Sequence, residues 1–301
     1  MTAVLVLGAS GLLGHSLVRE LSSSFEVWGT TRQQVTASHP LQRWLHADRW
    51  IGGVAICDRA VLGDALRRSR AKIVLNCAGS VPQIAPSPEH LWRTNGYGPH
   101  VVAQTAADHG ARLVHFSSDC VFSGAAGGYR ETDPPDADEA YGVSKRLGEV
   151  VGEHCLTIRK SIIGFELQPG HGLLEWLVRR RGRSIDAYST AFFSGMTTLA
   201  LSRIIRDLLA LDEAMTGLLH VAAARTSKGD LLRRLANELR LDIAVSSSTV
   251  VSCDRSLSAD VLLTRTNIRP PSWDEMIEDL VLDLRSYAYR PEIERLSRVL
   301  G

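Results

Sequence analysis

A glycine-rich turn near the start of the chain constrains the fold more than any other feature. The apolar run Ala3 to Leu7 leads into the turn Gly8-Ala9-Ser10-Gly11-Leu12-Leu13-Gly14, and a helical pattern runs from Leu12 to Leu21. One glycine of such a turn permits the tight bend, another lets backbone N–H groups approach a pyrophosphate, and the last lets helix and strand pack closely. The flanking strand and helix favour dinucleotide binding over an ordinary glycine-rich connection.

Strand and helix patterns then alternate through the first half of the chain. The predicted strands are Ala3 to Leu7, Glu26 to Gly29, Lys72 to Asn76, Arg112 to Ser117 and Cys155 to Lys160. The predicted helices between them are Ala60 to Arg70, Pro88 to His109 and Glu139 to His154, with a loop from Ser123 to Asp138. This alternation predicts an α/β fold, a doubly wound parallel sheet of the Rossmann type.

After Ser161 the regular alternation stops. Helical patterns cover Leu173 to Arg181, Leu199 to Leu211 and Ser227 to Leu239, and a strand pattern covers Gly217 to Ala222. Ser272 and Glu275 have the spacing of a helix capping box. We therefore predict a dinucleotide-binding Rossmann domain at residues 1–160. Residues 161–301 are predicted to form mainly a smaller C-terminal substrate-binding lobe, with some elements returning to the Rossmann sheet.

The end of the second predicted strand indicates which dinucleotide binds. An acidic residue there would accept hydrogen bonds from a ribose 2′-hydroxyl, but this chain has Thr30, Thr31 and Arg32. The planar guanidinium of an arginine suits a 2′-phosphate. The sequence therefore favours NADP over NAD, with an ordinary surface arginine as the alternative.

Tyr141 and Lys145 lie four residues apart in a predicted helix, so both side chains share one face. A phenol has a reference pKa of about 10, and a nearby lysine cation lowers the pKa by favouring the phenolate. Such a pair can transfer a proton to or from a carbonyl or alcohol oxygen. The same spacing also arises by chance on solvated helix faces.

Composition excludes several other classes of protein. The 34 Lys and Arg residues nearly balance the 33 Asp and Glu residues, so no nucleic-acid or membrane-surface partner is expected. No apolar run is long enough to span a bilayer, and the first residues do not resemble a signal peptide. The five scattered cysteines suggest reduced thiols, so we expect a cytoplasmic protein.

Several further segments, taken together with the glycine turn and the Tyr-Lys pair, resemble the extended short-chain dehydrogenase/reductase family. They are Asn76-Cys77-Ala78-Gly79, Asn95 in the long helix, His115 to Gly124, and Tyr129-x-Glu131-x-Asp133-x-Pro135 before Tyr141-Gly142-Val143-Ser144-Lys145. Ile158 to Gly164, Phe193 to Leu199, Arg255-Ser256-Leu257 and Pro270 to Trp273 are similar to its dTDP-4-dehydrorhamnose reductase-like, nucleotide-sugar reductase branch.

The resemblance implies a role for each matching residue. Tyr141 would donate the proton, Lys145 would hold the nicotinamide ribose, Ser118 would hydrogen-bond the substrate carbonyl, and Asn95 would support Lys145. The implied NADPH-binding residues are Gly8, Ser10, Gly11, Leu12, Leu13, Arg32, Ile56, Cys77, Ala78, Gly79, Tyr141 and Lys145. The implied substrate-binding residues are Ser118, Asp119, Cys120 and Tyr141.

The chain departs from this family pattern at three positions. Cys120 stands where these reductases usually have tyrosine, so the sugar or its orientation can differ. Ala55 replaces an aspartate that often precedes the residue over the adenine, here Ile56. Ser16 replaces a metal-binding glutamate, so no metal is expected.

The resemblance implies NADPH-dependent reduction of a keto group, at C4, on a nucleotide-activated 6-deoxy sugar. An NAD-retaining nucleotide-sugar epimerase is one alternative, and a non-catalytic NADP-binding regulatory subunit is an alternative of another class. The protein is expected to be a monomer or a homodimer. Whether Arg255 reaches the nucleotide phosphates stays open.

Overall fold

The alternating first half and one later strand build a seven-stranded sheet in which every pairing is parallel, in the order β11-β6-β5-β4-β1-β2-β3. We describe a computed structural model over residues 1–34, 39–85, 87–168, 170–211, 213–288, 290–291, 293–294 and 300. The strands are β1 (Ala3–Leu7), β2 (Glu26–Thr30), β3 (Trp50–Ile51), β4 (Ile73–Asn76), β5 (Arg112–Phe116), β6 (Cys155–Arg159) and β11 (Gly217–His220).

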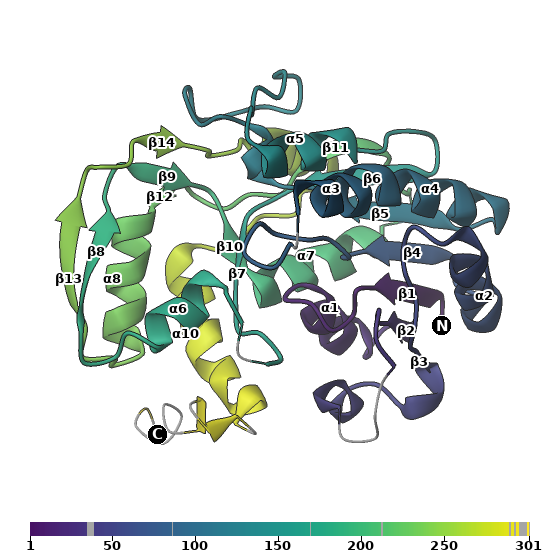
Figure 1. The fold of residues 1–301 in the computed structure, drawn as a ribbon, viewed down its shortest axis with the longest axis horizontal. Coiled ribbons are helices and arrows are strands. Elements are labelled where there is room, and N and C mark those ends of the chain that lie inside the picture. The colour runs from purple at the N-terminus through teal and green to yellow at the C-terminus, as the bar shows by residue number, and fades with distance from the viewer. Residues whose placement is uncertain are drawn as a thin grey trace.

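Helices cover both faces of this sheet, as the sequence predicted (Figure 1). They are α1 (Gly14–Leu21), α2 (Arg59–Ser69), α3 (Pro88–Leu91), the π-helix η3 (Trp92–Tyr97), α4 (Gly98–Asp108), α5 (Ala140–Leu147) and α7 (Thr198–Leu209). Alternate residues of β1 enter different cores. Val4 and Val6 pack in the cluster that contains α1 and α7, whereas Leu5 and Leu7 pack with α2 and α4. The strand order reverses between β1 and β4, where ligands bind in sheets of this kind.

The second half of the chain adds short strands and helices beside the sheet, at the left of Figure 1. The strands are β7 (Ile162–Ile163), β8 (Ser184–Tyr188), β9 (Ala191–Phe193), β10 (Met196–Thr197), β12 (Thr226–Ser227), β13 (Ala244–Ser248) and β14 (Cys253–Asp254). The helices are α6 (Leu173–Val178), α8 (Lys228–Glu238), α9 (Asp260–Thr266) and α10 (Trp273–Asp283). Single 3₁₀ turns are η1 (Pro40–Arg43), η2 (Ala47–Arg49), η4 (Asp119–Val121) and η5 (Leu284–Tyr287).

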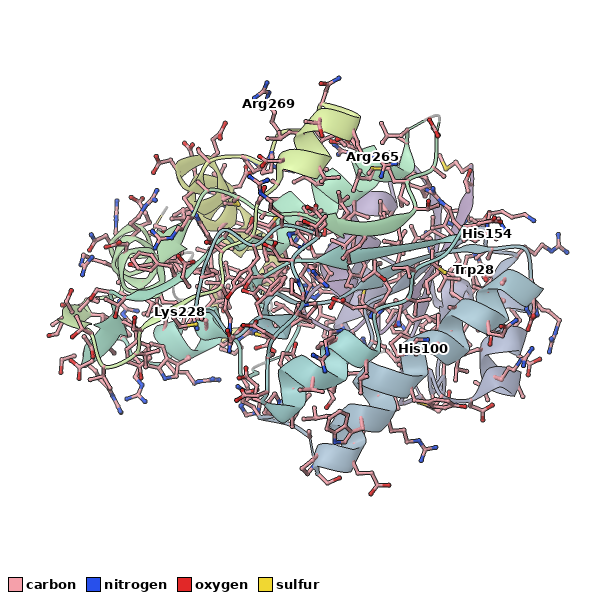
Figure 2. All side chains as sticks on the ribbon, turned by 90° about the horizontal axis from the view of Figure 1, so that it is seen from above. Trp28, His100, His154, Lys228, Arg265 and Arg269 are labelled. Carbon is pink, nitrogen blue, oxygen red and sulfur yellow. The ribbon has the colours of Figure 1, made fainter. Side chains whose placement is uncertain are left out.

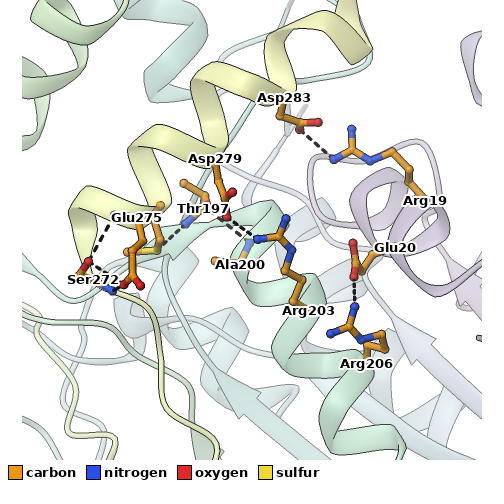
Figure 3. A network of polar contacts seen from close by, with 11 residues as sticks. Arg19, Glu20, Thr197, Ala200, Arg203, Arg206, Ser272, Glu275, Asp279 and Asp283 are labelled. Atoms are coloured by element: carbon orange, nitrogen blue, oxygen red, sulfur yellow. Dashed lines mark hydrogen bonds and ion pairs between the residues drawn. The ribbon is translucent and has the colours of Figure 1, made fainter. Parts of the chain in front are cut away.

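Helix α10 returns to the Rossmann part of the molecule and is fixed there by charged contacts (Figure 3). Its capping box is present, with Ser272 and Glu275 bonded reciprocally. Asp283 accepts a hydrogen bond of 2.8 Å from Arg19 of α1, and Asp279 pairs with Arg203 of α7. These contacts hold α10 against α1 and α7.

Two predicted helices differ from the observed ones. The segment from Pro88 to Asp108 is helical throughout, but its middle is the π-helix η3. The helix predicted to end at His154 ends at Leu147. Gly148, a common kind of helix-ending residue, follows the last turn of α5 and packs so closely that a Cβ there would lie 1.8 Å from the Asn95 carbonyl oxygen. His100, labelled in Figure 2, hydrogen-bonds the last carbonyl oxygen of α5, that of Leu147, at 2.7 Å.

Candidate active site

The glycine turn joins β1 to α1 and leaves backbone amides available to a ligand. Gly8 has a φ of +72°, and a Cβ there would lie 2.9 Å from the Ala78 backbone nitrogen. Ser10 and Gly11 are exposed. Within the described residues, the amides of Ser10, Leu12 and Leu13 donate no hydrogen bond to the protein. Free amides at the start of a helix suit an anionic pyrophosphate.

The other residues expected to bind the dinucleotide lie at the ends of neighbouring strands. Arg32 is exposed two residues after β2. Ile56 is buried beside the first turn of α4, where its Cδ1 atom would lie 2.7 Å from a Cβ on Gly98. Cys77, Ala78 and Gly79 follow β4, and the Asn76 side chain accepts a hydrogen bond of 3.2 Å from the Ala78 amide. The structure thus brings this segment against the glycine turn.

Asn95 in the π-helix joins three segments behind the Tyr-Lys helix. Its Oδ1 atom accepts from the Ser80 amide at 2.8 Å, and its Nδ2 atom donates to the Ser80 carbonyl oxygen at 2.8 Å. The same amide donates to the Ser144 hydroxyl at 3.1 Å, and that hydroxyl donates to the Tyr141 carbonyl oxygen at 2.7 Å. Asn95 therefore fixes α5 relative to the turn after β4. A π-helix at this point is typical of a functional site.

Lys145 is buried on α5 and points toward the sheet. Its Nζ atom donates a hydrogen bond of 2.7 Å to the carbonyl oxygen of Phe116, the last residue of β5. Burial and, to a smaller extent, the nearby Lys160 cation lower the pKa of Lys145 to about 7, although Glu149 opposes the shift. The ammonium is therefore poised to change charge near neutral pH.

Tyr141 lies half-buried one turn before Lys145. Burial raises the pKa of the phenol, and the Cys120 and Asp119 side chains raise it further, whereas the Ser118 side chain lowers it. The net direction is opposite to the lowering that the Tyr-Lys spacing predicts, because burial outweighs the lowering by Ser118. Tyr141 is therefore protonated at neutral pH.

Ser118, Asp119 and Cys120 form a hydrogen-bonded turn where β5 ends. The Ser118 hydroxyl donates to Asp119 Oδ1 at 3.1 Å and accepts from the Cys120 amide at 3.1 Å. This turn packs against α5 so closely that a Cβ on Gly142 would lie 2.2 Å from the Cys120 carbonyl oxygen. Burial raises the pKa of Cys120 to about 11, so its thiol is not a thiolate at neutral pH.

An open cleft of about 630 Å³ runs past the start of α5. Its walls come from the loop after β4, the turn at Cys120, the first residues of α5 and the lobe. The lining residues are Val81, Pro82, Gln83, Ala85, Ser87, Pro88, Leu91, Cys120, Glu139, Ala140, Tyr141 and Arg255. Ser118 and Lys145 are buried and do not line it.

Two residues next to the candidate site, Lys160 and Glu149, were not predicted from the sequence. Lys160 directly follows β6. Burial lowers its pKa, whereas the nearby Asp119 and Cys120 side chains raise it, so Lys160 interacts electrostatically with residues of the site. Glu149 accepts hydrogen bonds from Arg159 at 2.8 Å and from the Ser117 hydroxyl at 2.7 Å. A lysine after a buried parallel strand was the signal for Lys160, because the carboxyl ends of such strands meet at one edge.

Other classes of site have no support in the part of the chain that the structure describes. It contains no cluster of three or more side chains able to hold a metal ion. Ser16, at the position of the family's metal-binding glutamate, is buried and hydrogen-bonded to Ser202 at 2.9 Å. No described helix has the length and apolar character needed to cross a bilayer.

Comparisons with known proteins identify a matching family, similar proteins and structures of the same fold. The family model described as RmlD substrate binding domain matches residues 1–285. A dTDP-4-dehydrorhamnose reductase of Streptomyces griseus is 36% identical over 148 residues, which are 48% of this chain and 43% of that protein. The beta subunit of methionine adenosyltransferase 2 from Xenopus tropicalis is 29% identical over 147 residues, 48% of this chain and 41% of that protein.

The chain spans about half the length of the curated relatives it matches. A crystal structure of dTDP-4-dehydrorhamnose reductase from Bacillus anthracis in complex with NADP superimposes with a TM-score of 0.77. That alignment is 20% identical and covers 94% of this chain and 100% of the other, and at this identity it establishes the fold.

Proposed function

The chain belongs to the RmlD substrate binding domain family, and from that premise we propose that it is an NADPH-dependent reductase of nucleotide sugars. The proposed reaction reduces a keto group, at C4, of a nucleotide-activated 6-deoxy sugar. Residues 1–160 would bind the dinucleotide, and residues 161–301 would mainly bind the sugar nucleotide. The relatives named as sugar reductases support the reaction class.

One observation carries this proposal. A protonated phenol, that of Tyr141, lines an open cleft, with the Ser118 side chain close enough to affect its pKa and Lys145 one turn further along α5. A proton donor must hold its proton at the working pH, and the phenol of Tyr141 is protonated at neutral pH. The buried lysine behind it can hold a ribose without competing for the substrate.

The chain's own groups would act in the following way. Bound NADPH would supply the hydride. Ser118 would turn its hydroxyl hydrogen from Asp119 to the substrate carbonyl oxygen, and Tyr141 would give its phenolic proton to that oxygen. Lys145, in its charged form, would then stabilise the Tyr141 phenolate. The open amides of Ser10, Leu12 and Leu13 would hold the pyrophosphate, and exposed Arg32 would hold the 2′-phosphate.

A screen of NADPH consumption tests the proposal. The protein would be mixed with dTDP-, GDP- and UDP-linked 4-keto-6-deoxy sugars in turn, and absorbance would be followed. We expect turnover of at least one of them, with lower turnover when NADH replaces NADPH. Turnover of none, by a protein that binds NADPH, would contradict the reductase assignment.

Similarity to a methionine adenosyltransferase beta subunit favours a second candidate, an NADP-binding subunit of another enzyme. Under that assignment Tyr141 would carry no chemistry, and Tyr141→Phe would leave the biological role intact. An NAD-retaining epimerase is the third candidate. Tightly held NAD in the purified protein, released on denaturation, would identify that enzyme instead of the reductase.

A further inference from the structure

The first turn of α1 contains a buried histidine, His15, whose two ring nitrogens are both hydrogen-bonded. Its Nδ1 atom lies 2.8 Å from the carbonyl oxygen of Gly11 in the glycine turn, and its Nε2 atom lies 2.8 Å from the hydroxyl oxygen of Tyr287. Tyr287 is the last residue of η5, the turn that follows α10. A segment near the end of the chain thus reaches the glycine turn through one imidazole ring.

These partners determine which ring nitrogen of His15 carries the proton. A carbonyl oxygen only accepts hydrogen bonds, so Nδ1 is the donor toward Gly11. Burial lowers the pKa of His15 to about 4, so the ring is neutral at neutral pH and Nε2 is an acceptor. The Tyr287 hydroxyl therefore donates to Nε2, and this bond holds His15 in the tautomer with its proton on Nδ1.

Aromatic contacts confine both rings of this pair. The rings of His15 and Tyr287 are buried and meet edge to face, with their centroids 5.7 Å apart. The Tyr287 ring also contacts those of Phe165 and Trp44, whose centroids lie 5.4 and 6.3 Å away. The guanidinium carbon of Arg19 lies 5.7 Å from the Tyr287 ring centroid. Because the pair is buried, loss of the Tyr287 hydroxyl would remove the hydrogen-bond donor to Nε2.

The Gly11 carbonyl group determines the direction of a backbone amide that is open to a ligand. Its oxygen accepts a second hydrogen bond, of 3.1 Å, from the His15 amide. The peptide group that joins Gly11 to Leu12 is planar and trans, so its N–H points opposite to its C=O. Within the described residues, the Leu12 amide donates no hydrogen bond to the protein. The bonds from His15 therefore fix the direction of the Leu12 N–H.

We propose that Tyr287 and His15 are positioning residues for the dinucleotide: Tyr287 holds the His15 ring, and His15 orients the Leu12 amide toward the pyrophosphate. The inference rests on the proposed function, in which the glycine turn binds NADPH. It extends the set of residues that determine cofactor affinity to η5, near the end of the chain. Both side chains act through the backbone of the glycine turn, because the N–H groups of that backbone are the donors to the anion.

Calorimetry of Tyr287→Phe with two ligands, NADPH and 2′-AMP, tests the proposal. The variant keeps the buried ring and removes only the hydroxyl, and 2′-AMP has the adenine and 2′-phosphate of NADPH but no pyrophosphate. The NADPH dissociation constant should rise about 10-fold, as for a weakened hydrogen bond to a charged group, and that of 2′-AMP should stay within about twofold. Equal weakening of both ligands would indicate a general loss of structure and overturn the inference.

His15→Asn tests whether Tyr287 acts through His15. The asparagine amide can donate to the Gly11 carbonyl oxygen in place of Nδ1, and it does not need the Tyr287 hydroxyl to do so. His15→Asn should therefore keep part of the NADPH affinity. Adding Tyr287→Phe to His15→Asn should weaken NADPH binding no further, because the two residues act as one unit. Additive losses in the double variant would contradict this order of action.

Tyr129→Phe is the matched control. It also removes the hydroxyl of a buried tyrosine, but that hydroxyl accepts a hydrogen bond of 3.1 Å from the Ala126 amide and not from the glycine turn. Its NADPH dissociation constant should match that of the wild type. A loss as large as that of Tyr287→Phe would show that the effect is not specific to the glycine turn.

The tautomer of His15 can be measured directly in the wild-type protein. The ¹⁵N chemical shifts of the imidazole nitrogens distinguish the two tautomers, and comparison with His15→Asn assigns the His15 signals among those of the ten histidines. We expect the proton on Nδ1 at neutral pH. A proton on Nε2, or on both nitrogens, would overturn the inference whatever the affinities.

Failure of this inference and failure of the proposed function give different results. A wild-type protein that binds NADPH, together with a Tyr287→Phe variant of unchanged NADPH affinity, would overturn this inference alone. A wild-type protein that binds neither NADPH nor 2′-AMP would overturn the proposed function and the inference with it.

Discussion

The Lys145 ammonium donates a hydrogen bond of 2.7 Å to the carbonyl oxygen of Phe116, at the end of the neighbouring strand β5. This bond anchors the lysine beneath the candidate site, where burial lowers its pKa to about 7. Its charge therefore depends on pH in the range where the protein works.

The affinity for NADPH should depend on pH through Lys145. Above pH 7 the lysine of the free protein loses its proton, and an anionic cofactor raises its pKa again, so binding takes up a proton there. The NADPH dissociation constant should be flat below pH 7 and rise by up to about tenfold per pH unit above it. Fluorescence titration checks this. Lys145→Met should remove the pH dependence of the NADPH dissociation constant. Lys72→Met, a control at an exposed lysine, should retain it.

Preference for NADPH over NADH should depend on Arg32. Replacing it with glutamine removes a charge-assisted contact to the 2′-phosphate, so the dissociation constant for NADPH should rise about 10- to 100-fold. Affinity for NADH should not change, because NADH lacks that phosphate. Arg68→Gln, on the exposed side of α2, controls for net charge. Equal losses for both cofactors would argue against a 2′-phosphate contact.

Asn95→Ala should lower both the free energy of unfolding and kcat. The buried amide bridges Ser80 and Ser144, and removing it leaves their polar groups without partners at a cost of about 1–3 kcal/mol. Denaturant unfolding measures the loss of stability, and a lower kcat would indicate that α5 has moved. Exposed Asn237→Ala in α8 should change neither quantity. Normal kcat in Asn95→Ala would show that α5 keeps its place without this bridge.

Gly142→Ala should be poorly tolerated. The added Cβ would lie 2.2 Å from the Cys120 carbonyl oxygen and 2.6 Å from the Ala137 Cβ, so helix and turn must separate. Overpacking of this kind costs about 1–3 kcal/mol, and the shift should also lower kcat. At Gly152 an added Cβ meets nothing within 4 Å, so Gly152→Ala should be close to neutral. Equal melting temperatures for the two variants would contradict the packing argument.

The sequence predicted the parts of the fold that follow from local pattern. The apolar strands, the glycine turn and the capping box at Ser272 are all present. The early end of α5 was not predicted. Gly148, the residue after its last turn, packs against the Asn95 carbonyl oxygen, and this contact exists only in the folded chain. The π-helix around Asn95 and the short strands of the lobe likewise depend on tertiary packing.

The candidate site likewise contains residues that local motifs predicted and features that depend on tertiary contacts. Tyr141 and Ser118 could be selected from motifs, and the fold brings their side chains together. The direction of the Tyr141 pKa shift could not be predicted, because the spacing of Tyr141 and Lys145 does not show how deeply the phenol is buried. The contact between Arg255 and Cys120 joins distant segments, so no local pattern pointed to it.

The central claim is that Tyr141 gives the proton in a reduction by NADPH. The most direct test is steady-state kinetics of Tyr141→Phe beside the wild type, with the best keto-sugar substrate of the screen. Removing the proton donor should lower kcat by at least about 100-fold, while the dissociation constant for NADPH stays within about twofold. A Tyr141→Phe variant with wild-type kcat would contradict the account.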